Sequence, residues 1–345
     1  MSNNEERADF RYNGRLVFNG LRETEIRSGD PAEIKEALLD GLPRFERGNP
    51  HSKNEGFDKI QLSDLANSQE YILESDLGEL AENLIDEKLV WESYDDSLEF
   101  VDEEGDPVSA WLRQTNESYM YWDYPNHMII QGSQDKVEEA ERRINSALGE
   151  DVHVADVKFE PDFLLWLLYK HEYPREELPG PIKSRKLESS EVSGDNDGYG
   201  HTGRVEESRN IGESLPIILA VLQKMDFEMI EGIFGVNGHN VTAEIKSSGR
   251  IHVKVAGAID EAESKLKRAL VAVFFVSEFL RLHGSWKSLP DQDKYPPFEF
   301  FDDLAGTAAA NNVEVNFDMD ELIEEYEDKR GEIANPSELD HIGNT

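Results

Sequence analysis

The chain has 345 residues and a formal net charge of −38, because 73 Asp and Glu residues outnumber 35 Lys and Arg residues. Hydrophobic residues make up 38% of the chain. That share can fill a core, so the composition excludes an acidic disordered protein. Cysteine is absent, which excludes disulfides, thiolate nucleophiles and cysteine-ligated zinc.

A folded and uniformly acidic chain is typical of a salt-rich cytoplasm, where concentrated ions screen the repulsion between carboxylates. We therefore expect a cytoplasmic protein of a halophilic host, without a cofactor. The first ten residues, MSNNEERADF, lack the apolar run of a signal peptide. The most apolar segment, Leu266–Leu282, is interrupted by charged residues and is short for a bilayer span, so no membrane contact is predicted.

Residues 1–103 are predicted to form an N-terminal α+β segment. Asp30 followed by Pro31 and Glu33 is typical of a helix start. Further on, LSDLANSQEYILESDLGELAENLIDEKLVW predicts a short helix over Leu62–Ser68 and a second helix over Asp76–Lys88, with a wing over Val90–Val101.

That order resembles a winged helix-turn-helix, which implies that the second helix reads DNA. The same helix carries Asp76, Glu79, Glu82, Asp86 and Glu87, and acidic side chains oppose contact with phosphates. A helix and a hairpin that pack beside the next segment are therefore the alternative interpretation.

Two later stretches, Pro107–Leu148 and Met229–Leu270, align without a gap at an offset of 229 − 107 = 122. Each is predicted to form three antiparallel strands and a helix, so we predict an α+β fold with two related strand-strand-strand-helix units. In the later copy Asn237-Gly238 is a strong hairpin signal. The run IKSSGRIHVKVAGAIDEAESKLKRAL resembles the last hairpin and second helix of one half of a TATA-binding protein, which implies a saddle made of two such halves.

The remaining segments follow from composition. Residues 104–171 hold the first unit and an apolar helix over Pro161–Lys170, and residues 213–285 hold the second unit. Between them, residues 172–212 are rich in Pro, Gly and Ser without a period and are predicted to be a mobile linker. Residues 286–345 are predicted to be a tail with an acidic helix near Asp320–Lys329.

One group of residues has a possible enzymatic interpretation. Glu244-Ile245-Lys246, with Glu231 before it and Glu213 at a preceding helix start, resembles the PD-(D/E)xK nuclease pattern. The resemblance implies that the carboxylates hold Mg²⁺ and that the lysine acts on the attacking water. Two charges on an exposed alternating strand explain the same spacing without a metal.

A second group suggests binding. Alternation places Lys246, Arg250, His252 and Lys254 on one sheet face, and the aligned face of the earlier copy carries Met120, Trp122, Tyr124, Met128 and Ile130. Adjacent cationic and aromatic surfaces suit phosphate contact and base stacking. In the alternative, Trp122 and Tyr124 lie beneath the N-terminal segment and the basic face balances neighbouring acid.

The leading hypothesis is a non-catalytic binding or regulatory protein that contacts nucleic acid through Trp122, Tyr124, Lys246, Arg250, His252 and Lys254. A protein–protein adaptor that uses the acidic tail and apolar helices is the second hypothesis. A Mg²⁺-dependent nuclease is the third.

Overall fold

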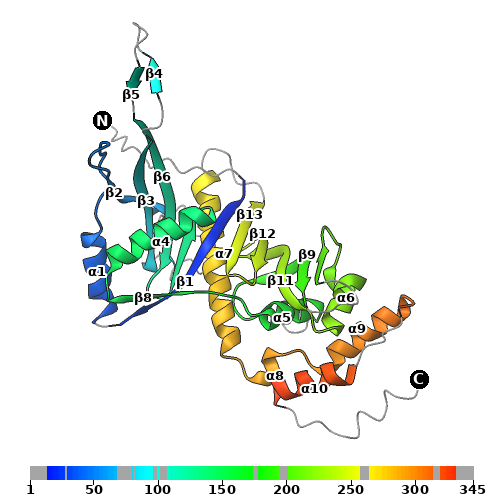
Figure 1. Ribbon diagram of the computed structural model, residues 1–345. Helices are drawn as coiled ribbons and strands as arrows, with labels where there is room; N and C mark the ends of the chain where they lie inside the picture. Colours follow the sequence, from blue (N-terminus) through cyan, green and yellow to red (C-terminus); the bar gives the residue numbers. More distant parts are fainter. Residues whose placement is uncertain are drawn as a thin grey trace. The chain divides into compact units, whose positions relative to one another are not determined.

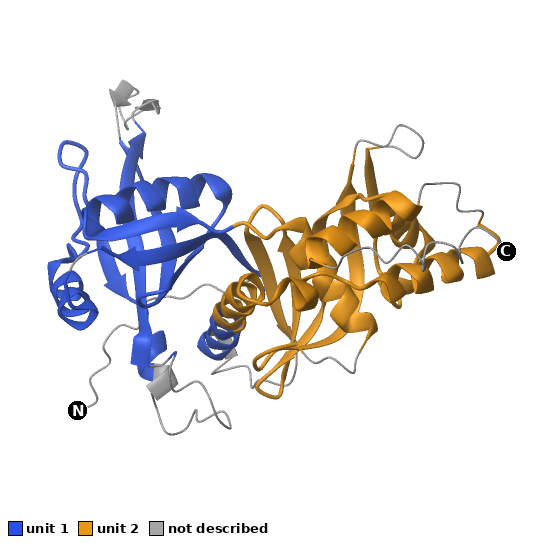
Figure 2. Ribbon diagram, turned by 90° about the horizontal axis from the view of Figure 1, so that it is seen from below, with its two compact units in different colours: residues 1–157, 259–274 blue, residues 158–258, 275–345 orange. Residues whose placement is uncertain are grey.

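The computed structural model describes the following residues: 14–27, 29–67, 80, 82–95, 99–101, 107–109, 111–173, 178–194, 201–256, 264–313 and 319–331. Antiparallel strands and helices are mixed in it, which confirms the predicted α+β class. The chain divides into two compact units (Figure 2). Unit 1 contains residues 1–157 and 259–274, and unit 2 contains residues 158–258 and 275–345.

Unit 1 is built on an antiparallel sheet with the strand order β1-β7-β6-β3-β2, and β8 also pairs with β1 (Figure 1). Its strands are β1 (Leu16–Ile26), β2 (Glu55–Lys59), β3 (Leu84–Asp95), β6 (Leu112–Asp123), β7 (His127–Gln131) and β8 (Val152–Asp156). β4 (Glu99–Val101) and β5 (Pro107–Ser109) pair separately with each other. Its helices include α1 (Pro31–Gly41), α2 (Leu62–Asn67) and α4 (Gln134–Leu148).

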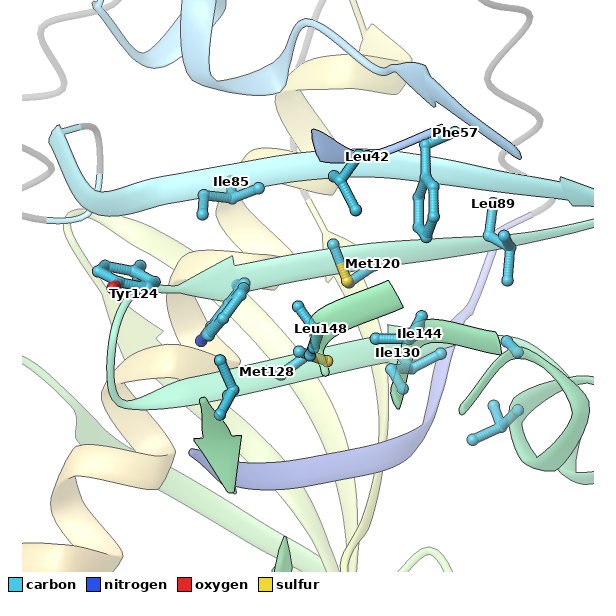
Figure 3. Close-up of a cluster of buried hydrophobic side chains, with 14 of the residues drawn as sticks. Leu42, Phe57, Ile85, Leu89, Met120, Tyr124, Met128, Ile130, Ile144 and Leu148 are labelled. Carbon is cyan, nitrogen blue, oxygen red and sulfur yellow. The ribbon is translucent and has the colours of Figure 1, made fainter. Parts of the chain in front are cut away.

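The core of unit 1 lies between the sheet and α4 (Figure 3). Spacings of three and four residues predict one buried stripe on α4, made of Val137, Ala140, Ile144, Ala147 and Leu148. The stripe is confirmed, because four of these residues are buried and Ala147 is partly buried against the same core. The predicted start of α1 is also confirmed, since Asp30 Oδ1 accepts a hydrogen bond from the backbone N–H of Ala32 at 2.8 Å.

The predicted winged helix-turn-helix is wrong. The short first helix is present as α2, and Leu80, Glu82 and Asn83 within the predicted second helix are helical. Residues 84–95, however, form β3, which pairs with β2 and β6 in the sheet, so the second helix does not continue to Lys88 and is not followed by a wing at residues 90–95. Two of the acidic residues have structural roles there. Asp86 accepts hydrogen bonds from the backbone N–H groups of Leu62 (2.5 Å) and Ser63 (3.2 Å) at the start of α2, and Glu87 pairs with Arg44 at 2.8 Å. The part of the predicted recognition helix over residues 76–79 lies outside the described residues.

Three neighbouring antiparallel strands followed along the chain by a helix occur twice, first in unit 1 as β3-β6-β7 with α4. The second set is β11 (Asp226–Val236), β12 (His239–Lys246) and β13 (Arg250–Ala256) of unit 2, followed by α7 (Ser264–Lys287), whose residues are divided between the two units. The last hairpins share a three-residue turn, closed by Asp123 and His127 in unit 1 and by Lys246 and Arg250 in unit 2. The outer strand of unit 1 differs from the prediction. The alignment with residues 229–236 predicts the outer strand at residues 107–114 and a turn at residues 115–116. Residues 112–123 instead form one strand without a turn, and β3 is the neighbouring outer strand.

Unit 2 is built on a sheet with the strand order β10-β9-β11-β12-β13. These strands are β9 (Lys183–Ser193), β10 (Thr202–Val205), β11 (Asp226–Val236), β12 (His239–Lys246) and β13 (Arg250–Ala256). The helices are α5 (Pro161–Glu172), the 3₁₀ turn η2 (Ile211–Glu213), α6 (Leu215–Leu222), α7 (Ser264–Lys287), α8 (Asp291–Lys294), α9 (Phe298–Ala310) and α10 (Met319–Arg330). α7 belongs to unit 1 up to Phe274 and to unit 2 from Phe275.

The predicted linker over residues 172–212 is wrong, because much of it forms β9 and β10. β9 pairs with β11 along its length, and Leu187 and Val192 are buried. β10 is the outermost strand of this sheet. On it, Arg204 lies 2.8 Å from Glu206 and 3.7 Å from Glu191.

The predicted tail is also part of unit 2. Phe300 and Phe301 of α9 are fully buried, and the ring of Phe301 lies 4.7 Å from that of Tyr326 in the acidic helix α10. Lys224 forms ion pairs with Glu321 and Glu325 of α10, both at 3.0 Å. The acidic helix is therefore packed against the fold and is not an exposed docking peptide.

α7 is apolar through most of its length. Within the described residues, Leu266–Lys287 is long and apolar enough to cross a membrane by length and composition, with a mean hydropathy of 1.2. The expectation that this segment is too short and too charged is therefore not met. Of the most apolar 18-residue stretch of this helix, 83% is buried inside the protein, as in the core helix of a soluble protein.

His171 near the end of α5 provides a prediction about pH. Its Nδ1 lies 2.9 Å from Ser184 Oγ, and burial lowers its pKa below the ordinary value of 6.5. A depressed histidine pKa means that the unfolded chain takes up the proton first, so unit 2 should lose stability as pH falls from about 6.5 toward the folded-state pKa. Urea unfolding at pH 7.5 and pH 5.5 should show a smaller acid-induced loss in His171→Gln than in the natural protein. Equal losses would contradict this assignment.

Candidate nucleic-acid interface

The hairpin of β11, β12 and β13 forms as its turn residues predict. Asn237 and Gly238 both have positive φ angles (45° and 77°) between Val236 and His239, as in the tight turn expected from Asn-Gly. Gly249 has a φ of 78° in the next turn. On β12, Val241, Ala243 and Ile245 are fully buried, so the intervening side chains point to the opposite face.

The pairing between strands identifies the residues of that opposite face, because directly paired residues of neighbouring strands lie on the same side of the sheet. One row contains Lys186, Ile233, Thr242 and Lys254, the next contains Glu231, Glu244 and His252, and the last contains Lys246 and Arg250. We name this surface the charged face. Along β9, β12, β13 and β11 from Met229 onward, its ionisable residues other than His252 are Lys183, Arg185, Lys186, Lys246, Arg250, Lys254, Glu188, Glu191, Glu231 and Glu244.

The charged face is accessible and locally cationic. Six cations and four carboxylates give 6 − 4 = +2 in a chain with a net charge of −38. Lys183, Arg185 and Lys254 are exposed, and Lys246 keeps 38% of its side-chain area exposed. The cationic surface predicted from Lys246, Arg250, His252 and Lys254 is therefore present on one face.

Some charged side chains of this face form ion pairs with one another, and others do not. Glu244 at its centre lies 3.0 Å from His252 Nδ1 and 3.4 Å from Lys246 Nζ, so its charge is partly balanced. Within the described part of the chain, Arg250 and Lys254 form no ion pair with a carboxylate. Their side chains can therefore contact an external anion.

Three cations of this face, Lys183, Arg185 and Lys186, were not predicted as part of it, because residues 172–212 were assigned to a linker. Arg185 crosses the face over Gly235, where an added Cβ would lie 2.5 Å from Arg185 Nε. Lys186 pairs with Glu188 at 2.5 Å. The available signal was the alternation of Leu187 with polar neighbours, which is weak because Ser and Glu dominate the strand.

The prediction that aromatic side chains form half of the binding surface is wrong. Trp122 and Tyr124 are 1% and 4% exposed, and Met120, Met128 and Ile130 lie with them in the unit 1 core (Figure 3). Trp122 Nε1 donates to Thr24 Oγ1 at 2.9 Å, and the Tyr124 hydroxyl donates to the Pro31 carbonyl at 2.5 Å. The alternative, in which the N-terminal segment covers these rings, is confirmed. Neither ring is accessible to a base.

The carboxylates of the nuclease interpretation are only partly brought together. Glu231 and Glu244 are direct partners on β11 and β12, and Lys246 lies beside Glu244. Glu213 lies on η2 rather than on these strands, and it is exposed. Among the described residues, no group of three His, Cys, Asp or Glu side chains is placed to hold a metal ion.

The geometry therefore offers a cationic sheet surface in unit 2 and no assembled metal centre within the described residues. Comparison with protein-family models finds no matching family, and comparison with curated proteins finds no matching relative.

Proposed function

We propose that this protein is a non-catalytic nucleic-acid-binding or regulatory protein, and that the charged face of unit 2 contacts the phosphate backbone. The observation that carries the proposal is the pair Arg250 and Lys254, whose cationic groups lie on an accessible face without a carboxylate partner among the described residues. Phosphate contacts from Lys and Arg supply most of the sequence-independent affinity of such proteins.

The acidic composition is compatible with this function. With a net charge of −38, most of the protein surface repels a polyanion. A local balance of +2 then favours phosphate contact at the charged face. In a halophilic cytoplasm, which we propose as the setting, concentrated salt screens the repulsion from the rest of the surface to within about 3 Å at 1 M.

The central carboxylates support binding rather than catalysis. Glu244 is engaged by His252 and Lys246 at 3.0 and 3.4 Å. Among the residues that the structure describes, no third carboxylate joins Glu231 and Glu244 in a group that could hold a metal ion, as the nuclease pattern requires. Two-carboxylate chemistry would also need a bound Mg²⁺ to activate water.

Replacing Arg250 and Lys254 together by alanine tests the proposal. We expect Kd for a labelled 20-nucleotide duplex to rise by about 3- to 30-fold, because an exposed charge pair contributes up to about 1 kcal/mol. The slope of log K against log salt should fall by about 1.8, or about 0.9 for each lost phosphate contact. Fluorescence anisotropy across a KCl series measures both quantities.

A double variant of α4, Lys136→Ala with Arg142→Ala, is the matched control, because both side chains are exposed and the charge change is the same. It should leave the salt slope unchanged. Equal effects of the two variants would show that only total charge matters and would refute the assignment to the charged face. Mg²⁺-dependent cleavage by the natural protein that is lost in Glu244→Ala with Lys246→Ala would establish the nuclease instead.

A further inference from the structure

Unit 1 exposes one aromatic side chain at the end of its longest strand pair. Trp111 and Leu112 are 45% and 44% exposed, and they are the large hydrophobic residues that the described structure leaves in solvent. They lie where β6 begins, opposite the end of β3, since Leu112 pairs with Asp95. Figure 1 shows β3 and β6 side by side up to this end.

The loop beside Trp111 is held in place by a buried carboxylate. Glu92 Oε2 accepts hydrogen bonds from the backbone N–H groups of Gly48 (3.0 Å) and Asn54 (3.2 Å), and Glu92 Oε1 lies 2.7 Å from Arg113. Burial raises the pKa of Glu92, but these two hydrogen bonds and the charge of Arg113 outweigh that effect and lower it. The carboxylate therefore stays ionised and fixes both ends of the loop at neutral pH.

Within the loop, a tight turn brings a histidine to the tryptophan. Asn49 and Ser52 exchange backbone hydrogen bonds at 3.0 Å, and Asn49 Oδ1 accepts from the His51 N–H at 3.0 Å. The ring of His51 then lies 6.4 Å from that of Trp111, with an angle of 70° between the planes. The two rings form an open corner rather than a closed stack.

The loop over residues 47–54 carries two exposed cations, although Glu46 and Glu55 flank it and Asp95 pairs with Leu112. Residues 47–54, RGNPHSKN, contain Arg47 and Lys53 and no carboxylate, and both cations are exposed. Arg113 lies nearby as well, but its charge is paired with the buried carboxylate of Glu92 at 2.7 Å. Two exposed cations with no carboxylate between them favour an anionic ligand.

We propose that Trp111 and the loop over residues 47–54 bind unpaired nucleotides, with a base stacked on the Trp111 indole beside His51 and the flanking phosphates at Arg47 and Lys53. This inference rests on the proposed function and adds the form of the ligand. Bases in a duplex already stack on one another, so a protruding indole is open only to a single strand. Every base has a π face, which makes such a contact tolerant of sequence.

Tryptophan fluorescence reads this contact directly. The chain has five tryptophans, and Trp91, Trp122, Trp166 and Trp286 are at most 6% exposed. Acrylamide should therefore quench mainly Trp111. A 12-nucleotide oligo(dT) is expected to quench the same emission and to shield it from acrylamide, whereas a 12-base-pair duplex should leave it unchanged.

Three variants separate stacking from other effects. Trp111→Ala should weaken single-strand binding by about 5- to 100-fold without altering duplex binding or the salt slope, because stacking is not a phosphate contact. Trp111→Phe should restore part of the affinity. Leu112→Ala removes an equally exposed apolar side chain that has no π face, and it should bind as the natural protein does.

The outcomes distinguish this proposal from the one on which it rests. Oligo(dT) that binds by anisotropy without changing the Trp111 emission, or full binding by Trp111→Ala, would overturn the stacking site, leave the charged face intact and point to a protein partner at Trp111. Loss of binding in Trp111→Ala, with no effect of Arg250→Ala and Lys254→Ala, would support this site and refute the charged face. No binding of any oligonucleotide would overturn both.

Discussion

Replacing Trp122 by alanine is expected to lower the free energy of unfolding of unit 1 by about 3–5 kcal/mol. The indole is 1% exposed, and its ring lies 4.9 Å from that of Tyr124 at an angle of 68°. Truncation opens a cavity beside Met120 and Ile144 and leaves Thr24 Oγ1 without its indole donor. Urea unfolding followed by circular dichroism measures the loss.

The matched control is Trp111→Ala, which removes the same ring from an exposed position and should change stability by no more than about 0.5 kcal/mol. Together the two variants test the reassignment of the aromatic residues. If Trp122→Ala unfolded at the natural midpoint yet lost nucleic-acid binding, the ring would have to be accessible, and the buried position described here would be wrong.

Replacing Gly232 by alanine is expected to cost about 1–3 kcal/mol, because β9 packs too closely against β11 to admit a methyl group. An added Cβ would collide with the carbonyl oxygen of Lys186 and would lie 2.9 Å from Leu187 Cδ2. The register between β11 and β9 already shifts next to this residue. Because the colliding atom is backbone, β9 must move as a whole.

Gly284 on α7 serves as the control. A Cβ there meets no heavy atom within 4 Å, so Gly284→Ala should stabilise the protein by up to about 1 kcal/mol through helix propensity. Thermal unfolding of both variants gives the comparison. A neutral Gly232→Ala would mean that residues 183–193 do not pack on β11 and would restore the linker interpretation. The same variant should also weaken phosphate binding, since displacement of β9 removes Arg185 and Lys186 from the charged face.

Local patterns predicted the elements that depend on neighbours in sequence. The spacing of Val137, Ala140 and Ile144 identified the buried side of α4, and Asn237-Gly238 identified the β11–β12 turn. Alternation along β12 and β13 placed Lys246, Arg250 and Lys254 together, because the side-chain period of a strand is 2.

The failures occurred where tertiary contacts decide the structure. Asp86 and Glu87 resembled an acidic helix, but β3 buries them because Leu62, Ser63 and Arg44 satisfy their oxygens. Alternation also does not reveal which face of a strand is covered, and for Trp122 the N-terminal segment decides that. Trp111 could not be identified from its neighbours in sequence, because Glu92 brings the loop over residues 47–54 to it from more than 50 positions away.

The outermost strand β10 has a consequence for self-association. When concentrated salt suppresses repulsion between copies of an acidic protein, its carboxylates no longer prevent sheets from joining edge to edge. β10 spans only Thr202–Val205, and Arg204 projects from it with 55% of its side-chain area exposed beside Glu191 and Glu206. Because this edge strand is short and its arginine is ion-paired, it offers an incoming strand few backbone groups to pair with. It should therefore disfavour association of copies through this edge of the unit 2 sheet at high salt.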